Sequence, residues 1–224
     1  MAVIATPYQS SDEKMVQTMQ GISLFSAGCF YIQYGAGSAI ANTTTATSVF
    51  SNTPGKVSDL SGSSILGSGG LNYARSSLYF PANSLTLGTI IRGRMVGSIK
   101  NNSSTPNLTF DVGLAPVSSG TYTAIATTGA KAMVSTGTEV FGEFEFELVV
   151  TAIGASGVAT MNGLIEWCVT SSAGVPLRFV SDPNQTFSNF DTTIANNLDA
   201  KITWGTAHAN NSFTPKYGFV EIIG

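Results

Sequence analysis

Residues 140–153 read VFGEFEFELVVTAI, and the pattern in this stretch decides the fold class. Phenylalanine and leucine alternate here with three glutamates, which are Glu143, Glu145 and Glu147. Successive side chains of a β-strand point to opposite faces, so the alternation predicts a strand with one buried and one exposed face. The glycine-rich residues 154–157 that follow predict a turn at its end.

Segments rich in β-branched and aromatic residues recur along the chain, separated by turns rich in Gly, Asn and Ser. We expect strands at residues 22–25, 29–34, 47–50, 89–99, 108–114, 122–125, 140–153, 158–163, 165–169, 177–180, 200–204 and 217–223. Many short strands without a helical pattern between them are typical of an antiparallel sandwich or barrel. The sequence therefore predicts an all-β fold, an antiparallel two-sheet jelly-roll sandwich.

The first part of the chain differs from the rest. Residues 10–19 place an N-cap serine before apolar residues at helical spacing, among them Met15 and Met19. Such a short helix is marginal alone, so we expect an extended N-terminal arm. The predicted division is an arm and loop-rich segment at 1–77 and a jelly-roll domain at 78–224, with the strands expected within 22–50 assigned to either part.

The charge composition argues against nucleic acid as a direct partner. Charged residues make up 10% of the chain, hydrophobic residues 43%, and the net charge is −3. The first 74 residues contain only two basic residues, Lys14 and Lys56. Condensing nucleic acid requires a dense cationic segment, so we expect no direct genome packaging. The longest apolar runs are far shorter than the ~20 residues of a membrane helix, so no membrane partner is expected.

The residues needed for common catalytic and metal sites are missing from the sequence. The single histidine, His208, lies in a Gly/Ala/Asn-rich segment, and no Gly-x-Ser-x-Gly motif supplies a nucleophile. One histidine and two distant cysteines, Cys29 and Cys168, do not supply a usual zinc site. We therefore predict no catalytic residues, no metal, no cofactor and no enzymatic activity.

The three glutamates of the alternating strand leave other interpretations open. Carboxylates could serve glycoside hydrolysis or calcium binding, but glutamates at i, i+2 and i+4 are also what an exposed strand face contains. Arg92 and Arg94 share one face of their own predicted strand and could pair with these glutamates across strands or subunits. The candidate interface residues are Arg92, Arg94, Glu143, Glu145, Glu147, Met15 and Met19.

Five phrases stand out in the second part of the sequence: FPANSLTLGT (80–89), IRGRMVG (91–97), NLTFDVGL (107–114), FEFELVVTAIGASG (144–157) and ITWGTAHANNS (202–212). In order and spacing they resemble a jelly-roll module of bacteriophage and other viral structural proteins. The resemblance covers roughly residues 78–224. It implies a virion component such as a capsid, head-decoration or fibre protein.

Three functions follow from this resemblance as expectations. The first is a capsid-associated decoration or cement protein that stabilises the particle through subunit contacts. The second is a single jelly-roll capsid protein that forms the shell itself. The third is a carbohydrate-binding fibre or receptor-binding head. It would use exposed loop aromatics, although most of the candidates could equally be core residues: Tyr73, Tyr79, Tyr122, Phe213 and Tyr217.

All three functions share the same expected partners and location. The partners are further copies of the chain, in a homo-oligomer such as a trimer, and other virion proteins. No secretory signal is visible at the N-terminus. The expected location is the virion, after synthesis in the host cytoplasm.

Overall fold

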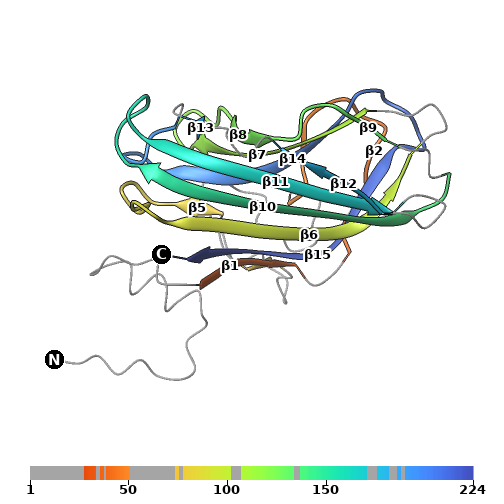
Figure 1. Ribbon diagram of the computed structural model, residues 1–224, viewed down its shortest axis with the longest axis horizontal. Helices are drawn as coiled ribbons and strands as arrows, with labels where there is room; N and C mark the ends of the chain where they lie inside the picture. The colour runs from red at the N-terminus through yellow and green to blue at the C-terminus, as the bar shows by residue number, and fades with distance from the viewer. Residues whose placement is uncertain are drawn as a thin grey trace, which may run out of the picture.

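The protein is all-β, with two antiparallel sheets packed face to face (Figure 1). A computed structural model describes residues 28–33, 36–37, 39–50, 74–75, 78–101, 107–133, 137–170, 176–181, 186–187 and 190–223. Within these ranges the chain forms strands and turns, and no helix could span a membrane. The predicted two-sheet sandwich of jelly-roll type is thereby confirmed.

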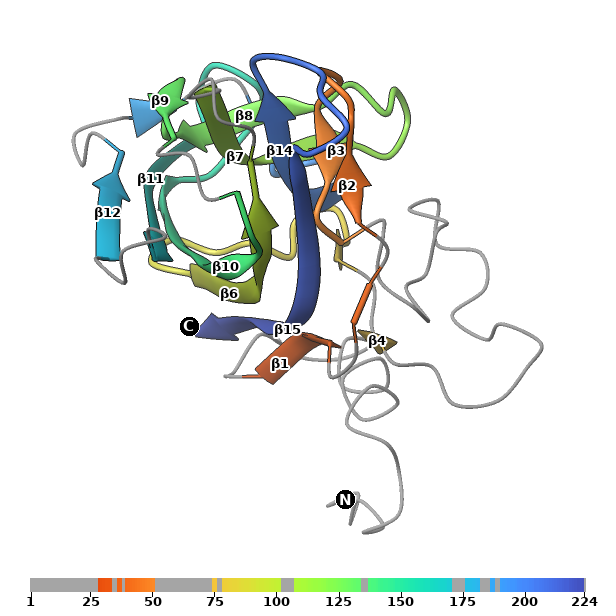
Figure 2. The ribbon, with the colours of Figure 1, turned by 90° about the vertical axis from the view of Figure 1, so that its right-hand side faces the viewer.

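The larger sheet has nine strands among the described residues and curves around the smaller one (Figure 2). Its main order is β12 (Pro176–Val180), β11 (Thr160–Thr170), β10 (Val140–Ala152), β6 (Ile90–Lys100), β15 (Ser212–Ile223), β1 (Gly28–Gln33) and β4 (Ala74–Arg75). Two further short strands pair with β11 and β15, respectively β13 (Thr186–Phe187) and β2 (Ile40–Ala41).

The smaller sheet has six strands in the described part of the chain. Its main order is β3 (Thr47–Ser48), β14 (Asn196–Trp204), β7 (Asn107–Pro116) and β8 (Thr123–Thr127). Two short strands pair with β14 and β7, respectively β5 (Tyr79–Phe80) and β9 (Lys131–Ala132). Strands far apart in sequence are therefore neighbours in both sheets.

Aromatic side chains from both sheets form the centre of the core. Phe144 of β10 stacks on Phe110 of β7 at 4.2 Å between ring centroids, and Phe213 of β15 packs edge-on against it at 4.9 Å. Trp167 and Trp204 are buried nearby in the same cluster. Stacked and edge-on aromatic pairs stabilise the fold beyond the area that they bury, so this cluster ties the two sheets together.

The N-terminal part of the described chain contributes to both sheets. Strand β1 pairs with β15, and β3 pairs with β14. The side chains of Ile40, Val49 and Phe50 are buried in the common core. Of the predicted arm and loop-rich segment, 1–77, residues 1–27 and 51–73 lie outside the described residues. The strand expected at 22–25 and the candidate interface residues Met15 and Met19 lie there too.

One strand prediction was wrong. Residues 158–163 and 165–169 were expected to form two strands, whereas β11 runs unbroken from Thr160 to Thr170. The first of the two expected strands ends at Gly163. A larger residue would not fit at this position, because its Cβ would lie 2.7 Å from the Cβ of Ala126 on the opposite sheet. The glycine thus marks a close approach between the sheets, not a strand end.

Candidate functional sites: a charged sheet face and an apolar loop end

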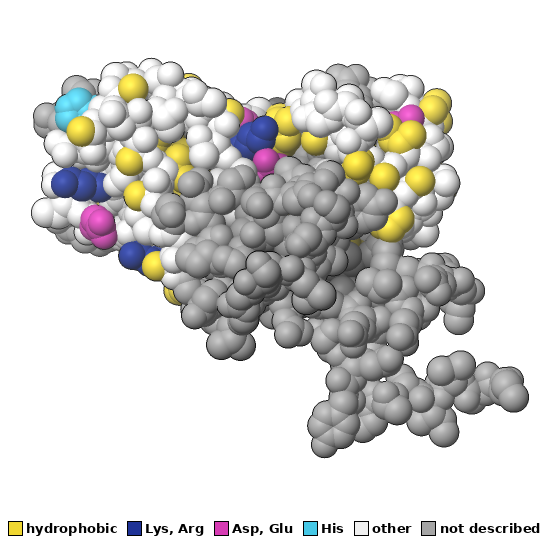
Figure 3. Space-filling model, turned by 180° about the vertical axis from the view of Figure 1, so that it is seen from behind, with side chains coloured by type: hydrophobic (Ala, Val, Ile, Leu, Met, Phe, Trp, Pro, Cys, Tyr) yellow, Lys and Arg dark blue, Asp and Glu magenta, His cyan; other side chains and the backbone are white. Residues whose placement is uncertain are grey.

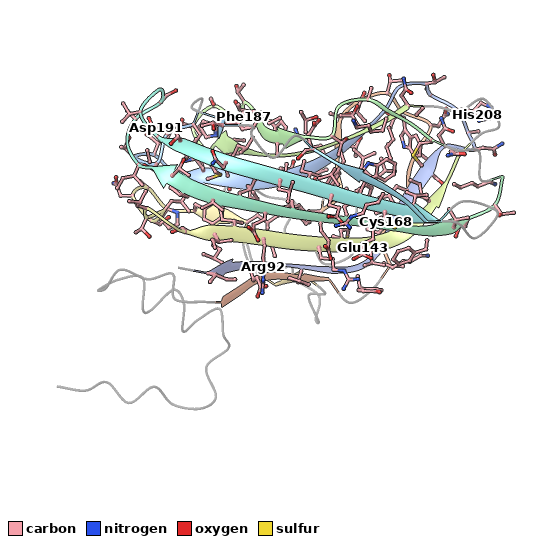
Figure 4. All side chains as sticks on the ribbon, viewed as in Figure 1. Arg92, Glu143, Cys168, Phe187, Asp191 and His208 are labelled. Atoms are coloured by element: carbon pink, nitrogen blue, oxygen red, sulfur yellow. The ribbon has the colours of Figure 1, made fainter. Side chains whose placement is uncertain are left out.

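The outer face of the nine-stranded sheet carries the charged residues that the sequence singled out. The alternation in β10 is confirmed, because Phe144, Phe146 and Leu148 are buried while Glu145 and Glu147 are exposed. Strand β6 lies beside β10, with Arg94 opposite Glu145 and Arg92 opposite Glu147. We call the outward side chains of β6, β10, β11, β12 and β15 the charged face (Figure 4).

Arg94 bridges two glutamates of the predicted ladder. Its Nε donates a hydrogen bond to Glu143 and lies 3.3 Å from Oε1 of Glu145. The hydrogen bond with Glu143 raises the pKa of Arg94, so the guanidinium stays charged. Partial burial, a hydrogen bond with Glu143 and the charge of that carboxylate raise the pKa of Glu145. The predicted cross-strand pairing of Arg94 is confirmed.

Two further ion pairs complete the charged face, and neither was predicted. Arg92 pairs with Glu221 of β15, not with Glu147 opposite it. Arg178 of β12 pairs with Glu166 of β11. No local sequence pattern indicates these two pairs. Arg92 meets Glu221, and Arg178 meets Glu166, only because of the strand order and register.

The charged face collects an unusual share of the chain's charge. The sequence contains 10 basic and 13 acidic residues, and eight of them lie at neighbouring positions of this face, beyond which Lys100 lies at the end of β6. These eight are Arg92, Arg94, Arg178, Glu143, Glu145, Glu147, Glu166 and Glu221. Exposed ion pairs contribute only about 0–1 kcal/mol each, so their arrangement contributes little to folding.

A cavity opens at the centre of the charged face, between β6, β10, β11 and β15. Its volume is about 290 Å³. Its lining combines both charges with apolar groups: Arg92, Gly93, Arg94, Glu145, Phe146, Glu147, Leu164, Glu166 and Phe219. We call this cavity the dish.

A second surface lies where three loops meet at one end of the sandwich, the end at which Figure 4 labels Asp191. Backbone hydrogen bonds tie these loops together. The amide of Asn83 donates to Thr192 at 2.7 Å, and that of Thr192 donates to Gly154 at 2.9 Å. The amide of Gly88 donates to Val150, also at 2.9 Å. The loops are therefore held in one arrangement.

Large apolar side chains project from these loops into solvent. The exposed fractions are 68% for Leu87, 51% for Ile153, 62% for Val158 and 36% for Ile194. Hydrophobic side chains gather at this end of the molecule, on the right of Figure 3. We call the four residues the apolar loop end. No local pattern in the sequence indicates this surface, since the four positions come from three separate loops.

Glycines shape two of these loops, and one of them, Gly157, lies in the turn predicted at 154–157. Gly88 has a φ of +86° and Gly157 a φ of +87°, a region that other residues rarely adopt. Their turns bring Leu87 and Val158 to the surface. Asp191 is a charged neighbour of this end, and hydrogen bonds from Thr193 lower its pKa.

The outer face of the six-stranded sheet holds a smaller polar cluster. Lys201 of β14 lies opposite Asp111 of β7, and its Nζ is 4.0 Å from the ring centroid of Tyr122. Burial raises the pKa of Asp111, although a hydrogen bond with Thr127 and the charge of Lys201 lower it. Burial also raises the pKa of Tyr122. This cluster is more enclosed than the charged face.

The aromatic residues that the sequence suggested for a carbohydrate site do not lie together. Of the two placements left open for the loop aromatics, Phe213 takes the core and is not an exposed loop residue. Tyr122 is mostly buried beneath Lys201, whereas Tyr217 is 52% exposed at the edge of the charged face. Tyr73 lies outside the described residues, and the side chain of Tyr79 is not described.

The single histidine and the two cysteines lie apart from one another in the fold. The Nδ1 of His208 accepts a hydrogen bond from the amide of Asn210, within a turn. Cys168 is a free thiol on β11 and is only partly buried. Cys29 lies on β1, four inter-strand steps of about 4.8 Å away, too far for a disulfide with Cys168. Among the described residues no three His, Cys, Asp or Glu side chains are grouped to hold a metal ion.

The comparisons with known proteins return no family model and no curated protein that matches. Two solved structures that align with this chain do so at low identity and low TM-score. One is the CBM2 module of the evolved Dit of Lactobacillus casei BL23 phage J-1, at 11% identity and a TM-score of 0.32, covering 88% of this chain and 96% of that one. The other is a protein of unknown function from Shewanella oneidensis MR-1, at 12% identity and a TM-score of 0.33, covering 98% and 96%. At these values neither similarity bears on what this chain does.

Proposed function

We propose that this chain is a structural protein of a virus particle, a decoration or cement protein that binds the particle through its apolar loop end. The carrying observation is the exposure of Leu87, Ile153, Val158 and Ile194 on loops tied by backbone hydrogen bonds. Exposed apolar clusters on a folded domain typically mark sites of protein contact. Because the loops are already ordered, binding costs little conformational entropy.

The viral context comes from the five phrases that resemble virion jelly-roll modules. Two of these phrases, 80–89 and 144–157, contain Leu87 and Ile153 and build two of the three loops. The other three phrases fall in strands β6, β7 and β14 and in the turn before β15. Two of the five phrases therefore contribute directly to the apolar loop end.

The charged face is a weaker candidate for the particle contact. Its three arginines, Arg92, Arg94 and Arg178, each pair with a glutamate of the same subunit. A second subunit is not needed to neutralise them, whereas the apolar loop end gains free energy when water leaves it. That Arg92, Arg94, Glu143, Glu145 and Glu147 form a subunit interface stays a prediction.

The test compares wild-type and variant protein in their binding to particles that lack the protein. The double variant Leu87→Ser with Val158→Ser should lower co-sedimentation with such particles at least tenfold and leave the free energy of unfolding unchanged within about 0.5 kcal/mol. Val180→Ser is the matched control, because Val180 is 44% exposed but lies on the charged face. Unchanged binding by the double variant, or absence of the chain from purified particles, would contradict the proposal.

A further inference from the structure

The dish is a concave site that the proposed particle contact leaves open. It lies on a broad face of the nine-stranded sheet, whereas the apolar loop end lies at one end of the strands. Its volume of about 290 Å³ is just below the roughly 300–1,000 Å³ of typical small-molecule pockets. Such a volume suits one small ligand or one unit of a longer one.

The charges of the dish argue against a charged ligand. Two arginines and three glutamates line it, so a cation and an anion would each meet groups of their own sign. Most of these charges are already paired, Arg94 with Glu143 and Glu145, and Arg92 with Glu221. Glu166 likewise pairs with Arg178 outside the lining. A charged ligand would therefore have to compete with existing ion pairs.

A neutral ligand with many hydroxyl groups meets no such competition. A hydroxyl both donates and accepts hydrogen bonds, so it can bond to a guanidinium and to a carboxylate at once. Hydrogen bonds to ionised groups are stronger than those between neutral groups. The ion pairs hold Arg92, Arg94 and Glu145 in place before a ligand arrives, which lowers the entropic cost of binding.

Apolar groups stand on two sides of these charges. Phe219 lies opposite Arg94 on β15, and Leu164 lies opposite Glu147 on β11. Both line the dish. A sugar ring has apolar C–H faces and a rim of hydroxyls, and an aromatic side chain offers a flat surface for such a face. The dish thus combines one aromatic wall, one aliphatic wall and a floor of mixed donors and acceptors.

We propose that the dish binds one unit of a neutral saccharide, with Phe219 packing on the sugar ring and Arg92, Arg94, Glu145 and Glu147 hydrogen-bonding its hydroxyls. The inference goes beyond the proposed particle contact, because it assigns a ligand to a different surface. A decoration protein with this site would give the particle a surface that binds saccharides.

The test is an array of glucose, galactose, mannose and N-acetylglucosamine, each as monosaccharide and oligosaccharide, followed by NMR titration of the best binder. Phe219→Ala and Glu147→Gln should each weaken binding at least tenfold. Phe141→Ala and Glu139→Gln are the matched controls, since both residues are exposed outside the dish and should leave affinity unchanged. Glu147→Gln keeps the size of an exposed side chain, so it reports on binding even if Phe219→Ala unfolds.

Three results would overturn the inference. They are no binding to any neutral saccharide, binding that Glu147→Gln leaves intact, and binding of acidic glycans or basic peptides in place of neutral sugars. The particle assay with the Leu87→Ser and Val158→Ser variant does not involve the dish. Failure of one proposal is therefore distinguishable from failure of the other.

Discussion

At the scale of single residues, Asp111 shows how the fold changes the chemistry of a side chain. In the sequence it is one residue of the apolar phrase NLTFDVGL, 107–114. In the structure it lies opposite Lys201, where burial raises the pKa of its carboxyl despite the hydrogen bond with Thr127. Its ionised form is thus less favourable in the folded state than in the unfolded state.

This shift predicts a pH dependence of stability. A carboxyl with a raised folded-state pKa binds more protons in the folded state, so its contribution to stability falls as the pH rises from its ordinary value of 3.8 through the raised value. Asp111→Asn should remove that fall. The measurement is urea unfolding of both proteins at several pH values, taken as the difference between the two curves.

The difference between the wild-type and Asp111→Asn curves is needed because other carboxyl groups also change the pH dependence of stability. The raised pKa of Glu145 acts in the same direction, and the lowered pKa of Asp191 in the opposite one. Both are present in wild type and variant, and their effects cancel in the difference. A difference curve that is flat, or that rises with pH, contradicts the assignment.

At the scale of elements, pairing of β6 with β10 decides which charges meet. The register places Arg94 opposite Glu145, and the long arginine side chain reaches Glu143 in the next row as well. A shift of one residue in either strand would turn every charged side chain of that strand into the core. The burial of Phe144, Phe146 and Leu148 therefore specifies the register of the ion pairs.

A double-mutant cycle measures what this pairing contributes. Arg94→Met keeps the aliphatic part of the side chain, and Glu143→Gln keeps the size. The coupling free energy between them should be about 0.2–1 kcal/mol, because Arg94 is 41% exposed. It should decrease when the salt concentration is raised from low values to 1 M, since salt screens exposed pairs.

The same cycle on a non-adjacent pair provides the control. Arg178→Met with Glu143→Gln should show no coupling, since Arg178 pairs with Glu166. A coupling above about 2 kcal/mol for Arg94 with Glu143, insensitive to salt, would mean that the pair is part of the core.

At the scale of the whole molecule, the question is whether the chain closes a shell or decorates one. A shell protein needs contacts on several sides to tile a closed surface. The described part of the sandwich shows four exposed apolar side chains at one end and a charged face whose arginines are paired internally. The dense cationic segment with which a shell protein binds a genome is missing from the sequence.

We therefore expect the chain expressed alone to form monomers or small oligomers. Electron microscopy and light scattering of the purified protein measure this directly. Closed particles in the absence of other virion proteins would favour the alternative in which this chain is the shell itself.

The sequence alone determined the features that depend on neighbours along the chain. The alternation in 140–153 predicted which side of β10 is buried, because side-chain direction in a strand repeats every two residues. The glycine-rich residues 154–157 marked a turn, because glycine readily adopts the backbone conformation found at Gly157. The absence of helical spacing between the strands predicted the all-β class.

Only the tertiary structure decided which distant residues meet. It brought Glu221 to Arg92 and Arg178 to Glu166, placed Phe213 in the core, and gathered Leu87, Val158 and Ile194 at one end. None of these follows from local pattern, because strand order and loop packing depend on contacts between segments that are separate in the sequence, by 12 residues for Arg178 with Glu166 and by 129 for Arg92 with Glu221. Both proposed functional surfaces, the apolar loop end and the dish, are consequences of that order.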